Sequence, residues 1–134
     1  MPSEQTGASD IAGFARKEER EIARYLDAVG RQVRPNPVEG ASGMGRQGDA
    51  FVDGVLHEFK TLEPGATSAT IKKVVNDSIR RGGQARYIVI DARATGLGRT
   101  EAQRGIFRAL GVARGLLDRV TVIGDGYFIG YGPR

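Results

Sequence analysis

The chain contains no cysteine and no tryptophan, and only one of its 134 residues is a histidine. The absence of cysteine excludes disulfides, thiolate catalysis and cysteine-based zinc sites. A ribonuclease that uses two histidines as acid and base is not compatible with a single histidine. No apolar run reaches the roughly 18 residues that a membrane-spanning helix needs. The sequence therefore predicts a domain that does not cross a membrane.

The charged residues of the chain are mostly basic. The net charge is +4, the sequence pI is about 9.8, and 27% of the residues are charged. A mildly basic domain is compatible with a nucleic-acid partner. The length predicts one domain, which we place at residues 9–134, after a flexible lead-in at residues 1–8.

The hydrophobic pattern predicts an α/β fold. It indicates helices over residues 9–29, 68–81 and 100–115, and strands over residues 31–34, 48–53, 55–61, 86–91, 120–123 and 127–131. Ser9 or Asp10 is the expected cap of the first helix, and Thr100 with Gln103 matches a capping box for the third. This order predicts a three-layer sandwich with a central mixed β-sheet flanked by helices.

The most informative stretch is a predicted hairpin around Asp53-Gly54. This pair is a strong signal for a two-residue turn, because a type I′ turn needs positive φ at both central positions. Such a turn places Asp49 directly opposite Glu58, and side-chain alternation puts Lys60 on the face of Glu58. Because opposed like charges destabilise a sheet, two carboxylates here indicate a cation between them. The layout is typical of a metal-dependent site that cleaves phosphodiesters.

An alternative is that Asp49, Glu58 and Lys60 form a salt-bridge network on a solvated sheet face, where such pairs contribute little. The same face, however, also carries Phe51 and Leu56. The opposite face carries further apolar side chains. Because both faces are expected to be partly covered, the pattern favours the functional interpretation.

The first predicted helix carries acidic residues beside its apolar stripe. On a helix that runs through residues 9–29, Glu18 falls within the stripe, Glu21 falls at its edge, and Glu19 points off the other side. A carboxylate on a core-facing stripe needs an ionic partner or a bound cation. One hypothesis is that Glu18 or Glu21 completes the metal site. The others are a salt bridge to a buried arginine and a wetter helix edge.

The second predicted helix is the expected nucleic-acid surface. Its polar faces carry cationic and amide side chains: Lys72, Lys73, Asn76 and Arg80. Free backbone N–H groups at its N-terminus are suited to hold a phosphate. The alternative is an ordinary charged solvent face. His57 points away from the acids on the hairpin and is assigned to the core.

Asp49, followed after eight residues by Glu58-Phe59-Lys60, resembles the signature of the PD-(D/E)xK nuclease superfamily, with Gly48 in place of the proline. The wider pattern is similar to the C-terminal toxin domains of contact-dependent growth inhibition and polymorphic toxin systems. It comprises Glu21-Ile22-Ala23, Leu26, Gly30, the stretch from Gly48 to Gly54, Glu58-Phe59-Lys60-Thr61, Gln84-Ala85 and Ile88-Val89-Ile90-Asp91.

This resemblance implies a set of roles. Asp49, Glu58 and the backbone carbonyl of Phe59 are the expected ligands of a divalent cation, most plausibly Mg²⁺. Lys60 is expected to position the attacking group and offset charge on the phosphorane, and Thr61 to contact the scissile phosphate. The resemblance selects Glu21 as the helix acid, whereas periodicity selects Glu18. Gln84 resembles a glutamine near the site of such nucleases.

The implied function is a toxin nuclease that cleaves tRNA and is neutralised by a cognate immunity protein. The resemblance also implies delivery to the cytoplasm of a target bacterium as the C-terminal domain of a larger secreted protein; otherwise the domain is expected in the cytoplasm of its own cell. Two alternatives remain, a metal-dependent DNA endonuclease and a non-catalytic nucleic-acid-binding domain of the same fold.

Overall fold

The computed structural model describes residues 8–37, 49–80, 85–113 and 115–132. Its elements follow the order α2 (Lys17–Ala28), β1 (Val33–Pro35), β2 (Ala50–Val52), β3 (Val55–Thr61), α3 (Ser68–Arg80), β4 (Tyr87–Asp91), α4 (Arg99–Val112), β5 (Arg119–Gly124) and β6 (Tyr127–Tyr131).

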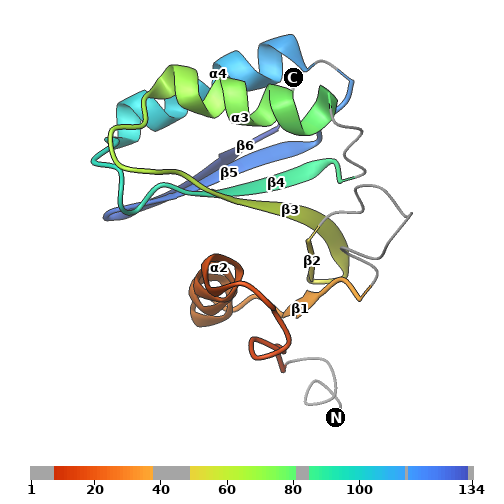
Figure 1. Cartoon of the computed structure of the whole chain (residues 1–134). Coiled ribbons are helices and arrows are strands. Elements are labelled where there is room, and N and C mark those ends of the chain that lie inside the picture. Colours follow the sequence, from red (N-terminus) through yellow and green to blue (C-terminus); the bar gives the residue numbers. More distant parts are fainter. Residues whose placement is uncertain (1–7, 38–48, 81–84, 114, 133–134) are drawn as a thin grey trace.

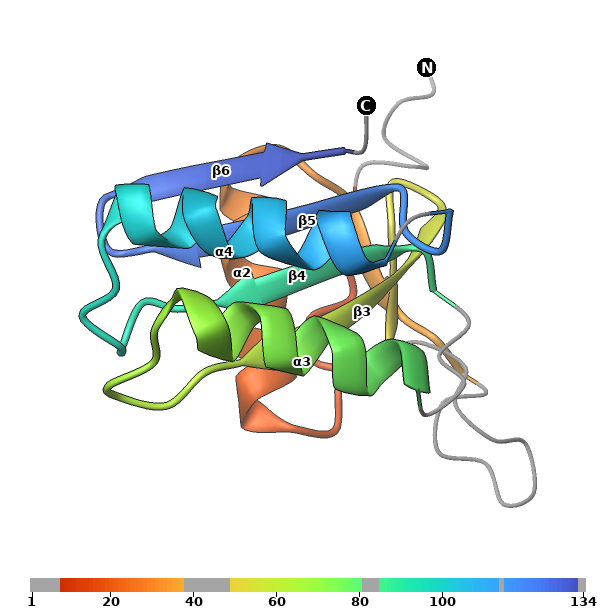
Figure 2. The same cartoon turned by 90° about the horizontal axis from the view of Figure 1, so that it is seen from above.

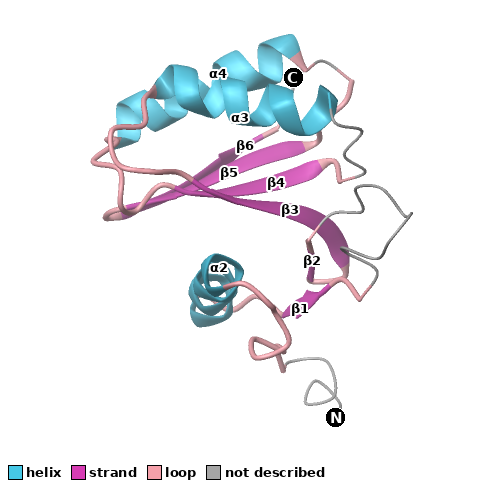
Figure 3. Ribbon diagram, viewed as in Figure 1, coloured by secondary structure: helices cyan, strands magenta, loops and turns pink. Residues whose placement is uncertain are grey.

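The six strands form one mixed sheet in which they lie side by side in sequence order. β3, β4 and β5 run parallel to one another, while the β1–β2, β2–β3 and β5–β6 pairs are antiparallel. Helices α3 and α4 lie on one face and α2 lies on the other (Figures 1 and 2). Figure 3 separates these layers by colour. The predicted three-layer sandwich with a central mixed sheet is therefore confirmed.

Each face of the sheet has its own hydrophobic core. The α3–α4 side buries alternate residues of β4 and β5, including Ile88, Ile90 and Val122. The α2 side buries the intervening residues, such as Val89 and Ile123. Because side chains alternate along a strand, each strand contributes to both cores, which explains its nearly continuous apolar sequence.

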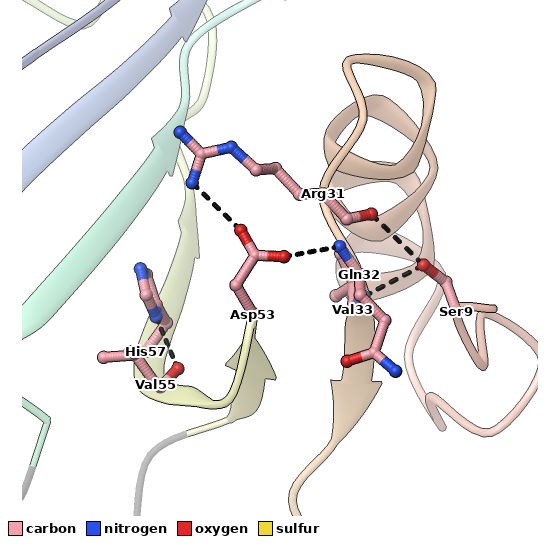
Figure 4. Close-up of polar contacts among 7 residues, drawn as sticks. All are labelled: Ser9, Arg31, Gln32, Val33, Asp53, Val55 and His57. Carbon is pink, nitrogen blue, oxygen red and sulfur yellow. Dashed lines mark hydrogen bonds and ion pairs between the residues drawn. The ribbon is translucent and has the colours of Figure 1, made fainter. Parts of the chain in front are cut away.

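The β2–β3 hairpin has the predicted turn and register. Asp53 and Gly54 have φ values of 49° and 81°, and Phe51 pairs with Leu56. Figure 4 shows the Asp53 carboxylate accepting a hydrogen bond from the Gln32 backbone N–H at 2.9 Å. Arg31 Nη1 lies 3.3 Å from the other carboxylate oxygen. The aspartate of the turn therefore also anchors the chain that leads into β1.

The predicted first helix is too long at its N-terminal end. Helix α2 begins only at Lys17. Asp10 caps a separate turn, because its Oδ1 accepts the Gly13 backbone N–H at 3.0 Å. Ile11 and Phe14 pack on the α2-side core from this non-helical segment. The apolar residues counted into one helical stripe therefore come from two segments, and the predicted phase was wrong.

The predicted capping box of the third helix was also wrong. Helix α4 begins at Arg99 with Gly98 in the N-cap position, and no side chain caps it. Thr100 lies inside the helix, and the Gln103 side-chain amide donates to the Tyr131 hydroxyl at 3.0 Å. A tertiary contact has replaced the local one.

The short predicted strand before the prolines is displaced by one to two residues. It extends to Pro35, which pairs with Ala50. Proline is tolerated there because β1 is an edge strand.

Candidate active site on the β2–β3 hairpin

Glu58 is a carboxylate buried under helix α3. It is only 1% exposed. The Ser78 hydroxyl of α3 donates to Glu58 Oε1 at 2.5 Å, and Lys60 Nζ lies 3.2 Å from Oε2. The Lys60 side chain keeps 24% of its surface exposed. An acid paired with a lysine whose ammonium is still reachable from solvent is suited to act on an anionic substrate.

Asp49 directly precedes β2 and is bonded to β3. It is 8% exposed, and its Oδ2 accepts the Phe59 backbone N–H at 2.7 Å. Its own N–H donates to the His57 carbonyl at 2.9 Å. The β2–β3 register ends at the Ala50–His57 pair, and Asp49 donates to the carbonyl of that same His57, so the expected pairing of Asp49 with Glu58 stays a prediction.

Glu19, rather than Glu18, is the acid of α2 that interacts with this site. Burial raises the pKa of the Glu19 carboxyl above its ordinary value of 4.5, and the negative charge of Asp49 raises it further. The Glu18 side chain is exposed. The sequence had predicted the opposite, with Glu18 facing the core and Glu19 pointing away from it. That prediction assumed a helix beginning at residue 9, whereas α2 begins at Lys17.

Carboxylate and carbonyl oxygens are the donor types that a divalent cation such as Mg²⁺ uses. A strand residue directs its N–H and C=O to the same side, so the Phe59 carbonyl faces the side on which Asp49 lies. Mg²⁺ typically uses one or two carboxylates and completes its shell with water and substrate phosphate. Among the described residues, no group of three or more acidic or histidine side chains is placed to hold a metal ion. A cation here would therefore depend on Asp49, Glu58 and the Phe59 carbonyl.

Thr61 and Glu21 lie on the other face of the sheet, away from Lys60. They line a cavity of about 530 Å³ between α2 and the carboxyl ends of β3 and β4, which we call the α2 pocket. Its walls are formed by Glu21, Arg24, Tyr25, Thr61, Asp91, Arg93 and Ala94. The structure therefore divides the predicted site residues between the two faces of one strand end.

Asp91 and Arg93 form an ion pair with two hydrogen bonds in the wall of the α2 pocket. Arg93 Nε lies 2.9 Å from Asp91 Oδ1 and its Nη2 lies 2.8 Å from Oδ2. These bonds raise the pKa of the Arg93 guanidinium above its ordinary value. Arg93 also donates to the Glu21 carbonyl at 3.2 Å and lies 5.1 Å from the centre of the Tyr25 ring. The loop after β4 is thereby fixed to α2.

The predicted nucleic-acid residues on α3 have different environments. Lys72, Lys73 and Arg80 are exposed, and Asn76 is half-buried. Lys73 Nζ lies 2.8 Å from Asp77 Oδ2. Gln84 lies outside the described residues.

His57 lies away from the acids, as predicted. Its Nδ1 lies 2.7 Å from the Val55 carbonyl oxygen (Figure 4), which requires the proton on Nδ1. Burial lowers the pKa of the His57 imidazole. Its ring lies 5.1 Å from that of Tyr87, so the residue has a packing role.

Sequence reasoning missed Ser78 and the pocket arginines. Ser78 is 3% exposed and follows Ile71 and Val75 on the buried stripe of α3 at helical spacing. A serine on a buried stripe needs a polar partner, which is a usable signal. Arg24 and Arg93 gave no comparable signal, because only the tertiary fold brings them together.

Comparison with known proteins identifies the class of this domain. The family model for the contact-dependent growth inhibition CdiA C-terminal domain matches residues 46–128. The chain therefore belongs to the CdiA C-terminal toxin domain family.

A solved structure gives the related fold. The chain is similar to the CdiA-CT/CdiI toxin and immunity complex from Burkholderia pseudomallei, with a TM-score of 0.63 and 20% sequence identity. The alignment covers 85% of this chain and 81% of the other. A search of curated proteins found no match.

Family membership implies delivery as part of a larger secreted protein. None of the helices in the described parts of the chain has the length and apolar character needed to span a bilayer.

Proposed function

We propose that this toxin domain is a nuclease that cleaves tRNA in the cytoplasm of a target bacterium. The observation that carries the proposal is the presence of two buried carboxylates, Asp49 and Glu58, at the hairpin that also carries Lys60. Buried carboxylates are costly to keep in a folded protein. Because these carboxylates do not favour folding, a role in catalysis or binding is the better explanation for them.

The roles follow from the positions of the groups. Mg²⁺ held by Asp49, Glu58 and the Phe59 carbonyl would supply charge stabilisation at the reacting phosphate. Lys60 is the cation of the hairpin that remains partly exposed. Its ammonium would bind a non-bridging phosphate oxygen and offset the charge that develops there. Ser78 keeps the Glu58 carboxylate in a fixed rotamer by donating to it.

Two observations support a nucleic-acid substrate. The chain carries a net charge of +4, and α3 presents Lys72 and Arg80 to solvent on the side of the sheet that buries Glu58. Exposed cations next to a buried acidic site attract a polyanion while leaving the acids to act on it. The choice of tRNA rests on the resemblance to tRNA-cleaving toxins of this kind.

A cognate immunity protein is the proposed partner. The similar solved structure is a complex of a toxin with its immunity protein. Because the present chain is basic, an acidic partner would associate quickly and bind in competition with nucleic acid.

The test compares wild type with Glu58→Gln on total tRNA and on plasmid DNA, each with Mg²⁺ and with EDTA. Glu63→Gln is the matched control, because Glu63 is exposed and lies outside the site. We expect discrete tRNA fragments from wild type and Glu63→Gln, and none from Glu58→Gln or in EDTA. Nicking of plasmid alone would make the domain a DNA endonuclease. A folded wild type that cleaves neither substrate would refute the enzyme.

A further inference from the structure

Among the described residues, the α2 pocket holds an acid and an arginine that form no ion pair. Glu21 and Arg24 are one helical turn apart on α2, and both line the cavity. Within the described residues, neither side chain takes part in an ion pair, although their charges are opposite. The pocket therefore presents a carboxylate acceptor and a guanidinium donor that are both available to a ligand.

The remaining charges of the pocket are neutralised internally. Asp91 binds Arg93 through two hydrogen bonds, at 2.9 and 2.8 Å. With Glu21 and Arg24 included, the pocket holds two acids and two arginines. A free phosphate in this pocket would be repelled by the Glu21 carboxylate, and the pocket has no excess of positive charge to offset that repulsion. The pocket is thus better suited to a neutral group with donors on one edge and acceptors on another.

We propose that the α2 pocket binds a guanine base of the RNA substrate. Guanine offers two adjacent N–H donors, at N1 and N2, which match the two oxygens of a carboxylate such as Glu21. Its O6 and N7 acceptors match the fork of an arginine such as Arg24. The other three bases do not offer paired donors and paired acceptors on adjoining edges. Because Glu21 is half-buried, its hydrogen bonds are expected to discriminate better than those of the exposed Arg24.

Tyr25 supplies an aromatic wall for the same base. Its ring is held by Arg93 at 5.1 Å and by the edge of Phe128 at 5.3 Å between ring centres. A fixed aromatic ring in a pocket is a common stacking surface for unpaired RNA bases. The cavity of about 530 Å³ falls in the size range of small-molecule sites and accommodates a nucleotide.

The position of the pocket indicates which base is read. Thr61 lines the pocket, whereas Lys60, the preceding residue of β3, points to the opposite face. The pocket and the proposed cleavage site therefore lie on the two sides of one strand end. We assign the pocket to a nucleotide that flanks the cleaved bond, an assignment that rests on the proposed nuclease function.

The test is a titration with single nucleotides followed by NMR of the intact domain. GMP, IMP, AMP, CMP and UMP are added separately to wild type. We expect GMP to bind tightest, on the order of tenfold over AMP. IMP lacks the N2 amino group and should bind more weakly than GMP. The resonances that move should include those of Tyr25 and Thr61.

Two variants test the proposed contacts. Glu21→Gln should bind GMP and IMP equally, because the paired acceptor is lost. Arg24→Lys keeps the charge but loses the fork, and should weaken GMP binding. Glu63→Gln and Arg99→Lys are matched controls at exposed positions outside the pocket and should bind as wild type does.

The outcomes separate this inference from the proposed function. Equal binding of GMP and AMP, no binding of any nucleotide, or a GMP preference that survives in Glu21→Gln would overturn the guanine pocket. A short RNA with one guanine should compete with GMP in the titration. If free GMP binds and the RNA does not, the pocket serves a free nucleotide and the assignment to the substrate is wrong. None of these measurements depends on cleavage, so a failure of nuclease activity would be recognised independently.

Discussion

Removal of the Glu58 side chain should lower the stability of the fold, because two neighbouring groups lose their partner. Replacement by alanine leaves the Lys60 ammonium and the Ser78 hydroxyl without their carboxylate partner. Because Lys60 keeps some contact with water, we expect a loss of about 2–4 kcal/mol in the free energy of unfolding, measured with urea. Glu101→Ala breaks an exposed ion pair with Arg104 and should cost no more than about 1 kcal/mol. Similar losses for the two variants would contradict the central position of Glu58.

Glu19 makes stability depend on pH in a definite direction. Burial and the charge of Asp49 raise its pKa in the folded protein above the ordinary 4.5. Below about pH 4.5 both the folded and unfolded states hold the proton, so the residue has no effect there. Above that pH the unfolded state releases the proton more readily, and the folded state loses stability relative to it. Glu19→Gln should therefore be more stable than wild type at pH 7 and equal to it near pH 4.

The control for this prediction uses the second cause of the shift. In an Asp49→Asn background the carboxylate charge next to Glu19 is absent. The gain from Glu19→Gln at pH 7 should then be smaller, because only burial remains. A gain of the same size in both backgrounds would show that Asp49 does not act on Glu19.

At the scale of elements, the packing of α3 against α4 depends on Gly105. A Cβ at this position would lie 2.8 Å from Ile71 Cδ1 and 3.0 Å from the Ser68 carbonyl oxygen. Gly105→Ala should therefore reduce the free energy of unfolding by about 1–3 kcal/mol. Gly111 lies on the same helix in open space, and Gly111→Ala should increase stability by roughly 0.5–1 kcal/mol. Calorimetric unfolding of both variants checks the opposite signs.

The elements that sequence reasoning predicted well are those defined by local chemistry. The Asp53-Gly54 turn determines which residues pair in the hairpin, so the pairing of Phe51 with Leu56 and of Val52 with Val55 followed from the sequence. The apolar run of β4 predicted a buried central strand for the same reason. Element boundaries were less reliable where tertiary contacts replaced local ones, as at Gln103, whose amide binds Tyr131.

The composition of the site was only partly predictable. Glu58 and Lys60 lie two residues apart on one strand, so alternation alone puts them together. Glu19 was misplaced because Phe14 packs in the core from a turn and not from the helix. The α2 pocket could not be predicted, since its walls come from α2 and from the ends of β3 and β4 and meet only in the folded sheet.

At the scale of the whole molecule, the proposed cleavage site and the proposed base pocket both lie at the carboxyl end of β3. Glu58 and Lys60 lie on the α3 side of the sheet, whereas Thr61 lines the α2 pocket on the other side. The two helical layers lie on opposite faces of the sheet (Figure 1). Under the proposed function, an RNA strand would contact both layers. We therefore expect the exposed cations of α3 to contact the phosphates of the same strand.

That contact predicts the salt dependence of RNA binding. Lys72 and Arg80 are exposed on α3, and each phosphate contact contributes about −0.7 to the slope of log K against log salt for single strands. In a cleavage-inactive Glu58→Gln background, Lys72→Ala with Arg80→Ala should reduce the slope for tRNA binding by between about 1 and 2. Lys17→Ala with Arg34→Ala removes the same charge from exposed positions on α2 and β1 and should leave the slope nearly unchanged. Equal changes for both pairs would mean that the net charge of +4 alone attracts the nucleic acid and that α3 does not form the contact surface.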